Sequence, residues 1–233
     1  MLSLPAQFCQ PQRRCWPPAC AAVKKGAPPP VKPRPAASTD PALGEGFTFG
    51  SQHVFLVDTQ AAVSAMVGVL QRSSVLAVDL EGVELGERGG KLSLIQLVTE
   101  DAPDVIFLMD VTVLGDAAFS TASVGDAPVS LRELFEDTRT ELLLWDCRSD
   151  ASALLHYHGV GLGAVVDLQL LEIASRLMTG RRPAFVSGLG KIVDATGHGG
   201  LGEKDKRRMA AIKAKAKALF APESGGAWGS GHL

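Results

Sequence analysis

The sequence feature that most constrains the fold is an apolar run that leads directly into two acidic residues one position apart. Residues 75–78 are Val-Leu-Ala-Val, and Asp79, Leu80 and Glu81 follow them. In a β-strand, residues i and i+2 point to the same face, so Asp79 and Glu81 are predicted to share one face of a buried strand near its end. Carboxylates held in this way suit Mg²⁺ or Mn²⁺. A solvated strand end is the alternative interpretation of the pair.

The net charge of −2 conceals a partition of charge along the chain. Residues 1–40 carry six basic residues (Lys or Arg) and one acidic residue, and residues 201–220 carry seven basic and two acidic residues. The body of the chain, residues 41–200, carries ten basic and twenty-one acidic residues. An acidic body disfavours a broad nucleic-acid footprint but is compatible with a metal-dependent site. The basic stretch at 204–217 is either a solvated helix face or an arm that contacts phosphates.

Residues 1–45 hold ten of the fourteen prolines, so this segment is predicted to be a disordered or polyproline-like basic tail. An organelle-targeting segment, a plain tail and an unreliable translation start all remain open for it. The cysteine spacing fits neither a zinc site nor a disulfide framework, which makes a reducing, intracellular compartment the expectation. No apolar run has the length of a membrane helix, and no membrane contact is expected.

The remaining sequence alternates between strand and helix patterns. Strands are predicted at residues 54–57, 75–80, 92–98, 105–109, 141–145 and 165–167, and helices at 60–70, 131–135, 149–158, 168–178 and 203–220. Thr59 and a capping box from Ser130 to Glu133 begin two of the helices, and Gly159 ends a third. Short connections make the strands within 75–109 an antiparallel meander. This order predicts a ribonuclease H-like three-layer α/β fold with a mixed five-stranded sheet, three antiparallel strands then two more, flanked by helices.

Six motifs follow one another along residues 54–226. They are Ala-Val-Asp-Leu-Glu-Gly at 77–82, Gly-Gly-Lys-Leu-Ser-Leu-Ile-Gln-Leu at 89–97, the segments 107–111 and 114–119, Leu-Trp-Asp-Cys-Arg-Ser-Asp at 144–150 with Leu154 and Leu155, Val-Asp-Leu-Gln-Leu at 166–170, and Leu-Phe-Ala-Pro-Glu-Ser-Gly-Gly at 219–226. Together they resemble the RNase D-like 3′–5′ exonuclease domain family. The resemblance implies a domain over residues 50–226, followed by a flexible tail at 227–233.

The resemblance also implies a chemistry and a set of site residues. Members of the family cleave phosphodiester bonds from the 3′ end of single-stranded RNA or DNA with two Mg²⁺ or Mn²⁺ ions. Carried over to this chain, Asp79, Glu81 and Asp150 are the catalytic metal ligands, and Asp150 could also stabilise the start of its helix. Gln96 is a further candidate for the wall of the cleft. Asp167 is expected to hold the turn into its own helix.

One departure from the family pattern bears on activity. The third motif of the family, a Tyr or His four residues before a last Asp, occurs nowhere in the 233 residues. The expectation is therefore a domain that is incomplete at its C-terminal end and lacks one carboxylate and the group that orients the attacking water. Three interpretations stay open: an impaired exonuclease, an inactive exonuclease fold that binds RNA or a protein, and a fragment from an incomplete gene model.

Overall fold

The computed structural model describes residues 41–44, 46–180 and 185–196, together with four exposed helical residues, Arg207, Ala210, Ala211 and Ala214. The Pro-rich tail predicted for residues 1–45 is described only at 41–44, where Pro41–Leu43 form a short 3-10 helix, η1. Most of the helix predicted at 203–220 and the whole tail predicted at 227–233 lie outside the described residues.

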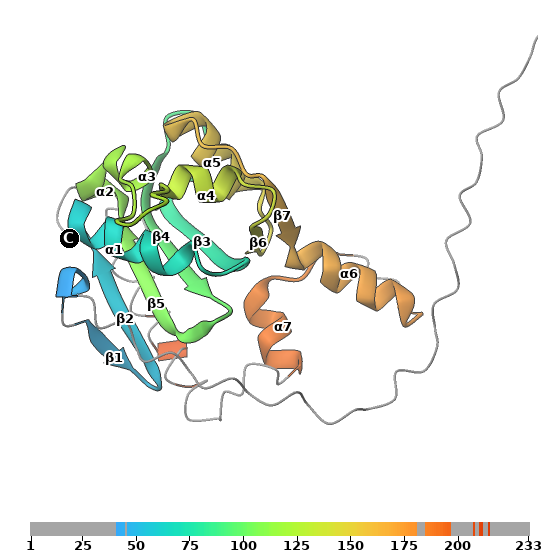
Figure 1. Ribbon diagram of the computed structural model, residues 1–233. Helices are drawn as coiled ribbons and strands as arrows, with labels where there is room; N and C mark the ends of the chain where they lie inside the picture. Colours follow the sequence, from blue (N-terminus) through green and yellow to red (C-terminus); the bar gives the residue numbers. More distant parts are fainter. Residues whose placement is uncertain are drawn as a thin grey trace, which may run out of the picture. The chain divides into compact units, whose positions relative to one another are not determined.

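Seven strands form one mixed sheet in the order β1-β2-β5-β4-β3-β6-β7 (Figure 1). Their bounds are β1 Phe47–Phe49, β2 Gln52–Val57, β3 Val75–Val83, β4 Lys91–Thr99, β5 Ala102–Asp110, β6 Glu141–Leu144 and β7 Ala164–Asp167. Strands β3, β4 and β5 form the predicted antiparallel meander. Strand β6 pairs in parallel with β3, and β7 pairs in parallel with β6.

The prediction of a five-stranded sheet is wrong, because the sheet extends by two strands beyond β5. Strand β2 was predicted as a strand, and it joins the sheet by pairing in parallel with β5. Strand β1 was not predicted, and it forms a hairpin with β2. It has three residues between Gly46 and Gly50, too few to display a period of two, and Phe47 is exposed.

Within residues 46–196, as far as the structure describes them, seven α-helices accompany the sheet. They are α1 Gln60–Leu70, α2 Val111–Leu114, α3 Ala117–Ser120, α4 Leu131–Glu136, α5 Arg148–His158, α6 Leu168–Met178 and α7 Leu189–Thr196. The predicted caps are confirmed, because Thr59 accepts from the amide of Ala62, Ser130 and Glu133 form both bonds of a capping box, and Gly159 ends α5 with a φ of 63°. Helices α2, α3 and α7 were not predicted, and the four residues of α2 and of α3 are too few to establish a helical period.

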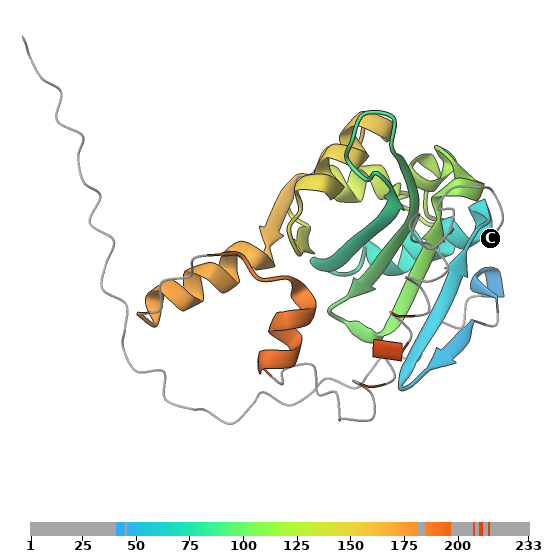
Figure 2. The same ribbon diagram turned by 180° about the vertical axis from the view of Figure 1, so that it is seen from behind.

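The strand order explains why the helices gather on one face. The connections β2–α1–β3, β5–α4–β6 and β6–α5–β7 all join parallel strands and all advance across the sheet in the same direction. Right-handed crossovers in one direction put their helices on the same face. In Figure 1 α1 and α4 lie in front of the sheet, and in Figure 2 the strands lie in front of them. The core fills this interface, with Phe107, Phe119 and Phe135 buried in it.

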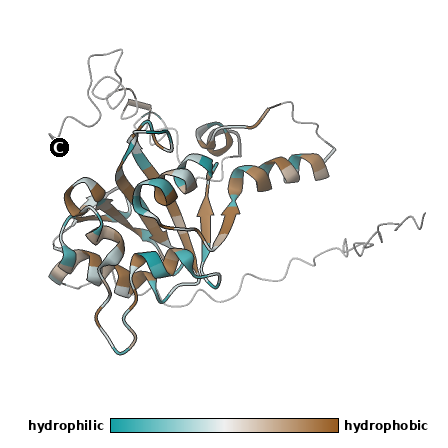
Figure 3. Ribbon diagram, turned by 90° about the horizontal axis from the view of Figure 1, so that it is seen from above, coloured by the Kyte–Doolittle hydropathy of each residue, from teal (hydrophilic) through white to brown (hydrophobic). Residues whose placement is uncertain are grey.

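The opposite face of the sheet, which the three-layer prediction would cover, carries none of the crossover helices α1, α4 and α5. Ala77, Asp79 and Glu81 lie on this face and are exposed. Helices α6 and α7 follow β7, and α6 is largely apolar in Figure 3. None of the described helices has the length and apolar composition to cross a membrane.

A glycine substitution tests how closely β3 and β4 must approach beside Glu81. A Cβ at Gly82 would collide with the carbonyl oxygen of Lys91 on β4, so Gly82→Ala should destabilise the domain by about 1–3 kcal/mol. The matched control is Gly68→Ala within α1, where a Cβ would meet nothing within 4 Å and helix propensity predicts a gain of about 0.5–1 kcal/mol. Urea unfolding measures both, and equal stability of the two variants would contradict the close contact.

Candidate active site

Strand β3 presents Asp79 and Glu81 on its exposed face. From residue 76 to residue 81 buried and exposed side chains alternate, as the sequence predicts. The β3–β4 register shifts between Glu81 and Gly82, and such a bulge re-aims the side chains around it. The two carboxylates therefore emerge from the same face at the irregular end of a strand whose other face is in the core.

Strand β4 supplies a partner for one of these carboxylates. Gln96 lies directly across from Asp79 in the antiparallel register, and its Nε2 donates a hydrogen bond to Asp79 Oδ2 at 2.8 Å. This bond fixes the plane of the Asp79 carboxylate. The sequence placed Gln96 near the cleft but not against Asp79, because the contact depends on a strand register that no local pattern specifies.

Helix α5 brings Asp150 toward the same end of the sheet. The helix starts just after β6, which is the parallel neighbour of β3, and Asp150 is the third residue of its first turn. Asp150 is only 8% exposed. Burial, followed by the negative charges of Asp79, Asp146 and Glu81, raises the pKa of Asp150 to about 7.

The pKa values of the other two carboxylates, Asp79 and Glu81, are also raised. Although both residues reach the surface, partial burial of their carboxyl groups raises the pKa of Asp79, and together with the charge of Asp79 it raises the pKa of Glu81. The charge of Asp79 therefore acts on both Glu81 and Asp150. Such a concentration of negative charge favours a bound cation, and hard oxygen donors suit a divalent one. Across the described ranges, however, no three His, Cys, Asp or Glu side chains come close enough together to hold a metal ion. The donor set fits a dication, whose binding would have to draw the side chains inward.

The β3–β4 loop joins the strand that carries Asp79 and Glu81 to the helix that carries Asp150. Ser152 Oγ donates to the carbonyl of Gly86 at 2.9 Å, and Tyr157 Oη donates to the carbonyl of Glu87 at 2.7 Å. Gly86 has a φ of 83°, and a Cβ there would lie 2.8 Å from the carbonyl oxygen of Ser149. These contacts were not predicted, although the cluster of glycines at 86–90 was the available signal for a close backbone approach.

A comparison with protein families gives a match that covers this part of the chain. The family model described as 3′–5′ exonuclease matches residues 54–195. The chain belongs to this 3′–5′ exonuclease family. The matched range contains Asp79, Glu81, Gln96 and Asp150, and exonucleases of this family use divalent metal ions.

Solved structures of an exonuclease resemble the domain. Trypanosoma brucei RNase D is 26% identical with a TM-score of 0.52, over 69% of this chain and 53% of that one. The structure of its complex with GMP is 27% identical with a TM-score of 0.52, and the match covers 65% of this chain and 43% of that one. The structure of its complex with RNA U12 is 30% identical with a TM-score of 0.45, and the match covers 52% of this chain and 39% of that one. The chain thus spans about half or less of these relatives. No curated protein sequence matches this chain.

The pKa of Asp150 predicts an unusual dependence of stability on pH. The pKa is higher in the folded state than its ordinary value of 3.8, so the stabilisation that protonated Asp150 provides is complete below that value and is lost as the pH rises through about 7. Asp150→Asn removes the repulsion and should raise the free energy of unfolding by about 1 kcal/mol at about pH 8, or roughly 2–4 °C in Tm.

Thermal unfolding between about pH 4 and about pH 8 in the presence of a chelator measures this difference. The gap between wild type and variant should close toward the acid end, and Asp126→Asn, in an exposed loop, should show no such trend. A variant less stable than wild type at the alkaline end would mean that the charged form of Asp150 is stabilised as a helix cap, which would contradict the account.

Proposed function

We propose that the domain hydrolyses phosphodiester bonds at the 3′ end of single-stranded RNA or DNA, with Asp79, Glu81 and Asp150 binding Mg²⁺ or Mn²⁺. The observation that carries the proposal is that these three acids come from two separate chain segments and that the negative charges of Asp79 and Glu81 raise the pKa of the buried Asp150. The membership of the family supports the reaction. The complex of Trypanosoma brucei RNase D with GMP supports a nucleotide as the ligand.

Each residue has a distinct task in this proposal. Bound divalent ions would activate a water molecule and stabilise the departing 3′ oxygen. Asp79, oriented by Gln96, and Glu81 would provide oxygen ligands from β3, and Asp150 would provide the ligand from α5. Asp150 must lose its proton before it can bind, so metal affinity should increase as the pH rises through its raised pKa.

The sequence also supports weak catalysis by the chain as given. It contains no Tyr or His four residues before an Asp, so it lacks the residues that would supply a fourth carboxylate and orient the attacking water. With three carboxylates, one of the two metals would bind weakly. The same observation favours a second candidate function, an inactive exonuclease fold that binds RNA or a protein partner.

Metal titration and a nuclease assay test the proposal together. The wild-type chain should bind Mn²⁺ by calorimetry, Asp79→Asn should abolish binding, and Asp126→Asn should leave it unchanged. Labelled single-stranded RNA and DNA should be shortened from the 3′ end slowly or not at all. Rapid stepwise shortening that Asp79→Asn abolishes would contradict the claim of weak catalysis, whereas failure of the wild type to bind Mn²⁺ would contradict the site itself.

The basic stretch near the C-terminus gives a second test of nucleic-acid binding. Deleting residues 203–217 removes seven basic and two acidic residues, and Arg207 within it is helical and exposed. If this stretch contacts phosphates, RNA affinity should fall and its dependence on salt should flatten, because fewer counterions are released on binding. Titration at two salt concentrations measures both quantities. An unchanged affinity and salt slope would identify the stretch as a solvated surface.

A further inference from the structure

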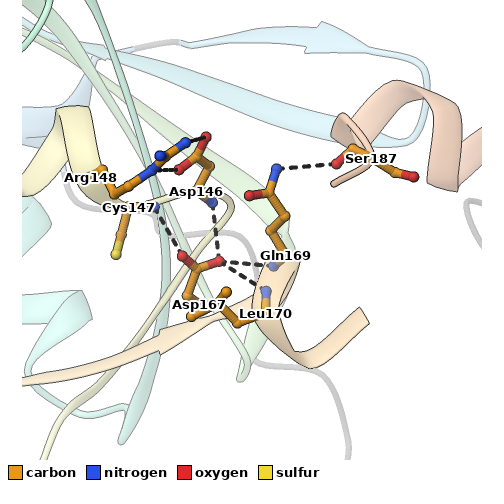
Figure 4. A network of polar contacts seen from close by, with 7 residues as sticks. All are labelled: Asp146, Cys147, Arg148, Asp167, Gln169, Leu170 and Ser187. Carbon is orange, nitrogen blue, oxygen red and sulfur yellow. Dashed lines mark hydrogen bonds and ion pairs between the residues drawn. The ribbon is translucent and has the colours of Figure 1, made fainter. Parts of the chain in front are cut away.

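We propose that Asp167, at the end of β7, is a positioning residue for Asp150 (Figure 4). The inference rests on the proposed metal site, because it concerns how one ligand of that site is held in place. It assigns to Asp167 a task beyond the turn into its own helix, namely to hold the backbone from which the helix of Asp150 starts.

The start of α5 lacks a cap of its own. Asp146 adopts a φ of 59°, in the left-handed region, where non-glycine residues are strained and Asp is among the best tolerated. The N-cap residue Cys147 makes no side-chain capping bond. The Asp146 carboxylate is instead paired with Arg148, at 2.6 Å. The turn that precedes Asp150 is therefore held by groups from outside it.

Asp167 provides the missing contacts. Parallel pairing places it beside Leu144, the last residue of β6. From there its Oδ1 accepts from the amide of Asp146 at 3.2 Å, and its Oδ2 accepts from the amide of Cys147 at 3.4 Å. Figure 4 shows the carboxylate between this turn and the start of α6. A side chain 17 positions beyond Asp150 thus holds the turn from which the helix of Asp150 begins.

The same carboxylate also caps α6. Its Oδ1 accepts from the amides of Gln169, at 2.9 Å, and Leu170, at 3.4 Å. Although burial would raise the pKa of Asp167, these amide donors and those of the turn hold it below its ordinary value. Asp167 is therefore charged at neutral pH, and a charged acceptor makes the stronger hydrogen bonds.

Asp167 is in turn fixed by α6. Gln169, in the first turn of that helix, is 6% exposed, and its Nε2 donates to the carbonyl of Ser187 at 3.1 Å. Ser187 lies just before α7 and is also buried. The contacts run from the segment before α7, through the start of α6 and Asp167, to the turn before Asp150.

The consequence is a specific loss of metal affinity. Oxygen–metal distances vary within only a few tenths of an ångström around about 2.3 Å, so a small displacement of the first turn of α5 removes a ligand while the core stays intact. Groups that orient metal ligands typically contribute about 10–100-fold to affinity. Loss of the Asp167 contacts should therefore weaken Mn²⁺ binding about tenfold.

Two substitutions separate this task from capping of α6. In Asp167→Asn one oxygen remains for the α6 cap and the amide of Asp146, but the NH₂ group that replaces Oδ2 cannot accept from the amide of Cys147. In Asp167→Ser the cap is preserved, since Ser is as good an N-cap as Asp, but the side chain is too short to reach the turn. The control is Asp110→Asn, because Asp110 at the end of β5 caps α2 through the amides of Thr112 and Val113 with nearly the same backbone angles.

The experiment measures the Mn²⁺ dissociation constant by calorimetry, with Tm and hydrogen exchange of residues 146–151 in the metal-free protein. Both Asp167 variants should weaken Mn²⁺ binding about tenfold and speed exchange at the start of α5, whereas Asp110→Asn should lower Tm alone. If the wild type binds Mn²⁺ and the Asp167 variants match the control in affinity, the positioning role is overturned. A wild type that binds no Mn²⁺ overturns the metal site, and this inference with it.

Discussion

The interaction on which the candidate site depends is the repulsion of the buried Asp150 carboxylate by the charges of Asp79 and Glu81. Asp79 and Glu81 come from strand β3 and Asp150 from a helix about seventy positions later, and the carboxyl group of each is partly withdrawn from water. Burial is the largest cause of their raised pKa values, and repulsion by neighbouring carboxylates adds to it at Glu81 and Asp150. A raised pKa expresses the free energy that the charged form costs at such a position. An arrangement of this kind persists only where backbone contacts hold the two segments together against the repulsion.

The backbone provides those contacts at several points. Parallel pairing of β3 with β6 sets where α5 begins relative to β3. The hydrogen bonds of Ser152 and Tyr157 to the β3–β4 loop fasten the helix along its length, and Asp167 holds the turn before its first residue. The apolar core on one face of β3 holds the strand rigidly, and the opposite, exposed face of β3 carries the charged groups.

The sequence could predict whatever depends on neighbours along the chain. Strand alternation placed Asp79 and Glu81 on one face, and local side-chain chemistry located Thr59, Ser130 and Gly159 at helix ends. Contacts that depend on strand register or on segments far apart in the chain could not be predicted from local sequence patterns. The bond from Gln96 to Asp79 depends on the β3–β4 register, and the bonds from Asp167 to the turn before α5 depend on the β6–β7 register. Strand β1 was not predicted because three residues are too few to form a periodic pattern.

The most direct test of the central claim is anomalous diffraction at the manganese edge from crystals of the chain grown with Mn²⁺. The account predicts an anomalous peak within about 2.0–2.6 Å of oxygens from Asp79, Glu81 and Asp150, with Gln96 still bonded to Asp79. A peak bound elsewhere on the protein, or ordered carboxylates with no peak between them, would contradict the assignment of these three residues as a metal site.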